Sequence, residues 1–287
     1  MDNFGKTIQI FLPDGSPTGI KIAEITSRTV KAILFPRNKF EEAANRHELS
    51  NVGVYFLFGE DEKDAQEMVY IGEAENLFER LKTHNKQKDF WNVAIAAFTS
   101  NNSFTKAHVK YLEWFCYDKA KSVDRYKLDQ TVPTKSYIPE PVQADIHDYF
   151  ETMKILLSTL GYPIFEETSG FHDKTMETDS DRFFISTKGI TASGEYSDEG
   201  LVVLQGSKAA LKFSPNFEKN SPGYAQLRKD LIESQVVVEE GGVYVFTKNY
   251  IFKSPSGAAA VILGRAANGW TEWKRNDGKT LDEVKRK

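Results

Sequence analysis

The stretch from residue 53 to residue 84 decides the fold of the first half of the chain. It reads Gly53-Val54-Tyr55, then a polar segment, then Tyr70-Ile71-Gly72, and then NLFERLKTH at residues 76–84. The flanking apolar runs VGVYFLF and MVYIG are rich in β-branched and aromatic residues, which predicts a hairpin with one tyrosine on each strand.

A helix is expected to follow this hairpin. Asn76 is a favourable N-cap residue. Arg80 and His84 are four residues apart, so on a helix they point the same way. The sequence therefore predicts that two tyrosines, an arginine and a histidine share one pocket.

Length and composition indicate a globular protein. With 287 residues the chain is long enough for about two domains. A single cysteine, Cys116, excludes an internal disulfide framework and favours a reducing compartment. No apolar run approaches the roughly 18 residues of a membrane span. We therefore expect a cytoplasmic protein without a membrane partner.

The charges are unevenly distributed. The net charge of −4 argues against a protein that coats nucleic acid nonspecifically. Between Arg80 and Lys127, however, ten basic residues stand against four acidic ones. This tract predicts a phosphate-binding face that includes Lys82, Lys86, Lys88 and Lys110, although a solvated helix surface is equally typical of such a pattern.

Four segments are expected along the chain, in an α/β (α+β) fold. Residues 1–48 are an N-terminal extension and residues 49–135 a domain that contains the tyrosine motifs. Residues 136–182 are a helical connector and polar linker, and residues 183–287 form a separate α+β module of strands, helices and Gly-rich turns.

Glu113 occupies an unusual position. It lies on the otherwise apolar helical stripe Val109, Glu113, Cys116, Ala120. A carboxylate on the inner face of a helix must be paired or must bind a cation. One such carboxylate suits a hard divalent cation that keeps most of its waters. The alternative is an ion pair with Arg80 or a lysine.

These elements together resemble the GIY-YIG nuclease superfamily over residues 50–130. The resemblance implies a small three-stranded antiparallel sheet flanked by helices. It also implies one Mg²⁺ or Mn²⁺ ion and hydrolysis of a phosphodiester. The chain departs from the family at Asp129-Gln130, where an asparagine is expected, and in the acidic loop between the tyrosines.

The resemblance also implies a role for each motif residue. Tyr55 would take the proton from the attacking water, and Tyr70 would orient the water or the phosphate. Arg80 would hold the scissile phosphate, His84 would assist there or accept a proton, and Glu113 would ligate the metal. A tyrosine has an ordinary pKa near 10, so phenolate at Tyr55 would need stabilisation by nearby cations.

The C-terminal segment FKSPSGAAAVILGRAANGWTEWKRNDGKTL resembles an uncharacterised bacterial module that is appended to such nucleases and to DNA-modification proteins. By that resemblance it would recognise the substrate or dock a protein partner. Arg265, Trp270 and Lys274 are its expected nucleic-acid contacts. The alternative is that its tryptophans fill a core.

The sequence thus predicts a metal-dependent endonuclease acting on single- or double-stranded DNA, in bacterial repair, restriction or phage defence. Two alternatives stay open. One is a nucleic-acid-binding relative with weak or no catalysis, which the Asp129-Gln130 departure favours. The other is a protein-interaction scaffold that uses the acidic loop and the C-terminal module.

Overall fold

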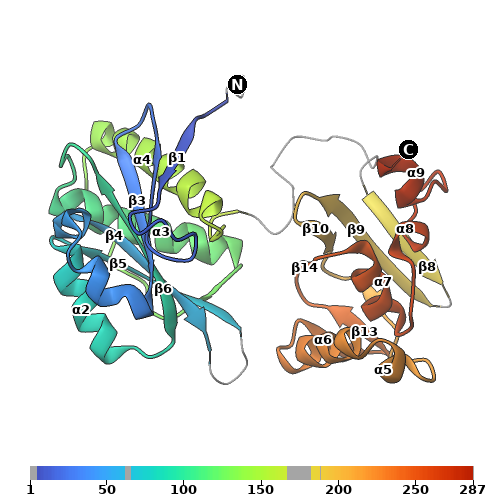
Figure 1. Cartoon of the computed structure of the whole chain (residues 1–287). Helices are drawn as coiled ribbons and strands as arrows, with labels where there is room; N and C mark the ends of the chain where they lie inside the picture. Colours follow the sequence, from blue (N-terminus) through green and yellow to red (C-terminus); the bar gives the residue numbers. More distant parts are fainter. Residues whose placement is uncertain (1–4, 62–65, 167–181, 188, 287) are drawn as a thin grey trace. The chain divides into compact units, whose positions relative to one another are not determined.

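A computed structural model of the chain describes residues 5–61, 66–166, 182–187 and 189–286 (Figure 1). The chain divides into two compact units, Met1–Glu166 and Glu167–Lys287. Both contain sheets and helices, which confirms the predicted α+β class. The centre of the acidic loop and most of the predicted polar linker lie outside the described residues. None of the helices in the described ranges has the length and apolar composition that a membrane span requires.

The first unit is built around one seven-stranded sheet with the order β1-β2-β3-β6-β4-β5-β7. All neighbouring strands are antiparallel except β5 and β7. The strands are β1 (Ile8–Phe11), β2 (Lys21–Ile25), β3 (Val30–Pro36), β4 (Gly53–Glu60), β5 (Glu67–Ala74), β6 (Trp91–Thr99) and β7 (Lys127–Leu128). The helical segments are η1 (Arg37–Lys39), α1 (Phe40–Ala43), η2 (His47–Ser50), α2 (Leu77–Gln87), α3 (Lys106–Val123) and α4 (Glu140–Thr159).

This sheet corrects two expectations. The predicted three strands are present as β5, β4 and β6, but they form only part of a larger sheet. The first 48 residues are not a separate extension, because they supply β1, β2 and β3. β3 pairs with β6 along seven residues, and its stretch from Ala32 to Phe35 is apolar and buried on both sides. A strand that is apolar on both sides belongs inside a sheet that is covered on both faces.

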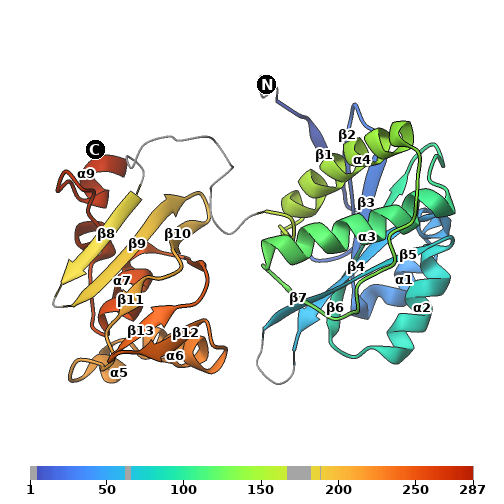
Figure 2. The same cartoon turned by 180° about the vertical axis from the view of Figure 1, so that it is seen from behind.

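Helices cover both faces of the sheet. On one face, residues of α3 and α4 pack with Val54, Phe56 and Ile71 (Figure 2). On the other face, residues of α1 and α2 pack with Tyr55, Leu57 and other sheet residues. The predicted helical connector is also corrected here, since α4 buries its apolar stripe against the first unit and belongs to it.

The second unit has two small sheets around a core of its own. A four-stranded sheet has the order β14-β10-β9-β8, and a three-stranded sheet has the order β11-β13-β12. The strands are β8 (Arg182–Thr187), β9 (Ile190–Ser197), β10 (Gly200–Val203), β11 (Lys208–Ala209), β12 (Val237–Glu240), β13 (Val243–Phe246) and β14 (Tyr250–Phe252). The helices are α5 (Phe217–Asn220), α6 (Pro222–Glu233), α7 (Pro255–Leu263), α8 (Gly269–Glu272) and α9 (Leu281–Lys285).

Capping and turn residues set the ends of the helices and strands in the second unit. Ser254 caps α7 by accepting a hydrogen bond from the Gly257 N–H, and Gly264 ends the helix with φ of 62°. Gly241 and Gly242 both have positive φ and join β12 to β13. Two successive residues of this kind form the tight turn that suits the twist of a hairpin.

Candidate functional site

The two motif tyrosines lie on the same face of neighbouring strands. β4 and β5 pair so that Tyr55 stands opposite Gly72 and Leu57 opposite Tyr70. Residues directly opposite one another share a face. The Tyr55 and Tyr70 rings are therefore diagonal neighbours, with centroids 6.1 Å apart. The predicted hairpin with one tyrosine on each strand is confirmed.

Gly72 makes room for the Tyr55 ring. A Cβ atom on Gly72 would lie 2.3 Å from the Tyr55 hydroxyl oxygen and 2.4 Å from Cζ. Gly53 is equally restricted, since a Cβ there would lie 2.3 Å from the Ala97 carbonyl oxygen. Each glycine of the motif thus permits a close approach that a larger residue would block.

Arg80 and His84 on α2 meet at the Tyr55 hydroxyl. The helix begins where expected, with the Asn76 side chain accepting a hydrogen bond from the Glu79 N–H. The Arg80 Nε–H donates to the Tyr55 oxygen at 3.3 Å, and His84 Nε2 lies 2.8 Å from the same oxygen. The His84 ring also lies 4.9 Å from the Tyr70 ring. The structure therefore brings all four motif side chains together.

Burial controls the protonation of this cluster. Tyr55 is 0 % exposed, and burial raises its pKa well above the ordinary value although the Arg80 charge and hydrogen bond act to lower it. Burial, with the charges of Arg80 and Lys88, lowers the pKa of His84 to about 4. His84 is consequently neutral near pH 7, and its buried Nδ1 has no hydrogen-bond partner in the described part of the chain.

Arg80 is the exposed cation of the cluster. Its hydrogen bond to Tyr55 is the main cause that raises its pKa. No carboxylate pairs with Arg80 among the residues that the structure describes. An arginine held by its Nε atom and free of an acidic partner can present the rest of its guanidinium to a phosphate.

Glu113 lies half-buried on α3 and forms no ion pair within the described ranges. The predicted alternative, a pairing with Arg80 or a lysine, is therefore not observed. Burial and the neighbouring Glu73 raise the pKa of Glu113 to about 7, and the charge of Arg80 opposes this shift. Although α3 and α2 cover opposite faces of the sheet, Glu113 thus lies within the electrostatic range of Arg80.

Glu73 was missed in the sequence. It follows the YIG motif on β5, so it points to the face opposite Tyr70, and its carboxylate pairs with Lys106 at 2.9 Å. The alternation of side chains along a strand was sufficient to place it beside α3. Glu73 and Glu113 together give the site two carboxylates close enough to interact.

Asp129 and Gln130 both lie against β5. The Asp129 carboxylate pairs with Lys88 at 2.6 Å, and Lys88 lies 4.4 Å from the centre of the Tyr70 ring. The Gln130 side-chain oxygen accepts a hydrogen bond from the Ile71 N–H at 2.5 Å. These residues therefore border the cluster and fix the strand that carries Tyr70.

The predicted basic face is only partly available. Lys82, Lys86 and Lys110 are exposed and form no ion pair within the described residues. Lys88 is neutralised in part by Asp129. Three of the four lysines are thus free to meet phosphates.

The residues of the second unit that were predicted to contact nucleic acid differ in burial and in ion pairing. Trp273 is fully buried in the core, as the alternative expectation had it. Trp270 is half-buried, and the Arg286 guanidinium lies 3.4 Å from its ring centre. Arg265 pairs with Glu272 at 2.7 Å, whereas Lys274 is exposed and has no ion pair in the described part.

Comparison with known proteins bears on the second unit. A family model described as a domain of unknown function (DUF4357) matches residues 183–285. This confirms the predicted uncharacterised C-terminal module. No curated protein and no solved structure matches the chain.

Proposed function

We propose that the first unit is a GIY-YIG-type, metal-dependent endonuclease that hydrolyses phosphodiester bonds of DNA. One observation carries the proposal: Arg80, which has no acidic partner among the described residues, donates a hydrogen bond to Tyr55, and its charge acts to lower the pKa of Glu113. A cation and a carboxylate on one site match the needs of phosphodiester hydrolysis, which are positioning and charge neutralisation.

The donor set fits Mg²⁺ or Mn²⁺. Groups of three or more His, Cys, Asp or Glu able to hold a metal are absent from the described residues. Mg²⁺ is commonly held by one or two carboxylates plus water and substrate phosphate. Glu113, with Glu73 beside it, supplies such hard oxygen ligands, and a cation there would offset the burial and the Glu73 charge that raise the pKa of Glu113. When bound, the cation would polarise the phosphate and activate water.

The motif side chains would bind the phosphate and orient the attacking water. Arg80 would hold the scissile phosphate and stabilise its developing charge. Tyr70, half-buried where Tyr55 is fully buried, is the better placed of the two to orient the attacking water. Tyr55 would fix Arg80 and His84, to which its hydroxyl is bonded. The resemblance instead implied that Tyr55 takes the proton from the attacking water. A buried phenol with a raised pKa is a poor base, so we assign Tyr55 a positioning role.

The test is nicking of supercoiled plasmid DNA by the purified full chain with Mg²⁺, with Mn²⁺ or with EDTA. The variants are Glu113→Gln and, as the matched control, Asp118→Asn, an exposed carboxylate on the same helix. We expect metal-dependent nicking that Asp118→Asn retains and Glu113→Gln loses by about a hundredfold or more. Equal nicking by all three proteins would indicate a contaminating nuclease and contradict the proposal.

A second candidate function is nucleic-acid binding without cleavage. The complete burial of Tyr55 and the pairing of Asp129 with Lys88 favour it, since each withdraws a polar group from a substrate. This alternative predicts salt-sensitive retention of DNA and no nicking with either metal.

A further inference from the structure

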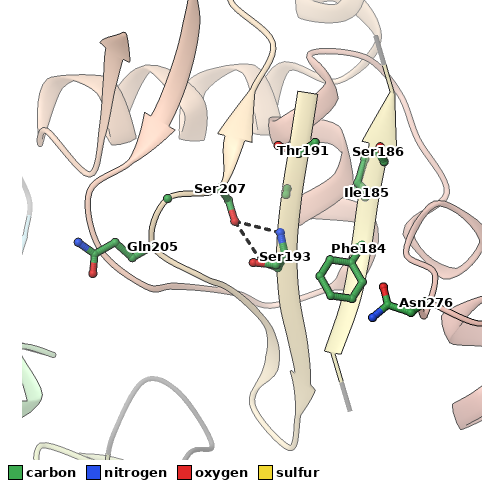
Figure 3. Close-up of a pocket in the computed structure, with 10 residues that line it drawn as sticks. Phe184, Ile185, Ser186, Thr191, Ser193, Gln205, Ser207 and Asn276 are labelled. Carbon is green, nitrogen blue, oxygen red and sulfur yellow. Dashed lines mark hydrogen bonds between the residues drawn. The ribbon is translucent and has the colours of Figure 1, made fainter. Parts of the chain in front are cut away.

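The second unit has a hollow of about 490 Å³ on the open face of β8 and β9 (Figure 3). This volume lies within the range of roughly 300–1,000 Å³ that is usual for small-ligand sites. The lining comes from three separate places: the two strands, the turn at Gln205–Ser207, and Asn276 near the C-terminal end. Neither the domain match nor the motif residues of the first unit assign a role to it.

Polar and apolar side chains both line the hollow, and none of the lining residues in the described part of the chain is charged. The Ser207 hydroxyl accepts a hydrogen bond from the Ser193 N–H and donates one to the Ser193 carbonyl oxygen, each at 3.1 Å. The side chains of Ser186, Thr191 and Gln205 form no hydrogen bond within the described residues. Without a cation among the described lining residues, burial of a phosphate or carboxylate against them would be costly. A neutral ligand with donors and acceptors is favoured.

One aromatic ring stands among these polar groups. Phe184 is half-buried and lies opposite Ser193 in the β8–β9 register, so both side chains share the open face. Figure 3 shows the Phe184 ring on this face with the Asn276 amide beside it. An aromatic platform next to hydroxyl and amide groups suits a flat, polar heterocycle.

A free cation stands next to the platform. Lys274 forms an antiparallel backbone bridge with Phe184. The Phe184 N–H donates to the Lys274 carbonyl oxygen at 2.7 Å, and the Lys274 N–H donates to the Phe184 carbonyl oxygen at 3.0 Å. Bridged partners of this kind project to the same side. Lys274 is exposed and without an ion pair in the described part, so it can contact an anion outside the hollow.

We propose that this hollow binds one base of single-stranded DNA. The base would stack on Phe184, its polar edge would face Thr191, Ser193 and Asn276, and Lys274 would contact a neighbouring phosphate. A base in a duplex is covered by its neighbours, so only an unstacked base can lie on the ring. The choice of DNA as the ligand rests on the proposed function of the first unit.

The test is fluorescence anisotropy of the full chain in EDTA, which keeps a metal-dependent nuclease inactive. The probes are a short fluorescein-labelled oligothymidine and an abasic strand of the same length. We expect the wild type to bind the oligothymidine at least about fivefold more tightly, since stacking contributes that much or more per base. Phe184→Ala should bring the two affinities to within about twofold, and Phe184→Trp should restore the preference.

Two further variants separate base contacts from phosphate contacts. Lys274→Ala should weaken binding of both probes alike and reduce the salt slope by about one. Tyr224→Ala, which removes an exposed aromatic residue outside the hollow, should behave as the wild type. Equal binding of the two probes by the wild type, no binding of either, or a preference that survives Phe184→Ala would overturn the inference. A base preference in a chain that never nicks plasmid would contradict only the proposed nuclease.

Discussion

Each of the two units carries a segment of aromatic and basic residues that the sequence predicted to bind a ligand. The surroundings of these side chains differ between the two units. In the first unit, Tyr55, Tyr70, Arg80 and His84 converge, and Arg80 forms no ion pair within the part of the chain that the structure describes. In the second, Trp273 fills the core and Arg265 pairs with Glu272. Spacing on a hairpin and a helix fixes where side chains meet, whereas composition alone leaves open whether an aromatic residue faces a ligand or the core.

The largest effect is expected in the core of the second unit. Trp273→Ala should lower the free energy of unfolding by about 3–5 kcal/mol, as truncation of a fully buried tryptophan does. Trp270→Ala should lower it by about 1–2 kcal/mol, through its ring contacts with Arg286 and Tyr196. Chemical denaturation of the full chain measures both. Similar losses for the two variants would show that the distinction between them is wrong.

The buried His84 should make the free energy of unfolding depend on pH, whereas an exposed histidine should not. The pKa of His84 falls to about 4 in the folded chain, mainly through burial, from about 6.5 when unfolded. Between these values the unfolded chain binds more protons, so stability is complete above about pH 6.5 and is lost as the pH falls towards 4.

The loss attributable to His84 should reach about 3 kcal/mol. Denaturation between pH 7 and pH 4 of the wild type and of His84→Gln isolates this part, and the exposed His147→Gln serves as the control. If His84→Gln loses stability on acidification as steeply as the wild type, His84 is not buried in its neutral form.

A smaller effect is expected at the glycine that accommodates Tyr55. In Gly72→Ala the new methyl group would overlap the Tyr55 hydroxyl, so the ring must move away from Arg80 and His84. We expect a loss of about 1–3 kcal/mol in stability and a fall in nicking.

Gly223→Ala is the matched control in the second unit. It lies on α6 with open space at its Cβ position, so the change should stabilise the helix by up to about 1 kcal/mol. Unchanged nicking in Gly72→Ala would show that the position of Tyr55 does not matter to the reaction.

Local signals explain how much was predictable. Asn76, Ser254 and Gly264 act through neighbouring backbone groups, so the helices that they begin or end could be predicted. β3 was missed because an apolar run that is buried on both faces lacks the alternation of a surface strand. The hollow at Phe184 was missed because its lining comes from separate segments and carries no spacing signal.

The central claim is that Arg80 of the first unit, which has no acidic partner among the described residues, is required for phosphodiester hydrolysis. Arg265 of the second unit, which pairs with Glu272, is not required. Single-turnover nicking of plasmid DNA with Mg²⁺ by Arg80→Ala and Arg265→Ala tests it directly. We expect Arg80→Ala to be slower than the wild type by about a hundredfold to a thousandfold and Arg265→Ala to be within about twofold, as for a solvent-exposed ion pair. Equal rates for both variants would contradict the claim.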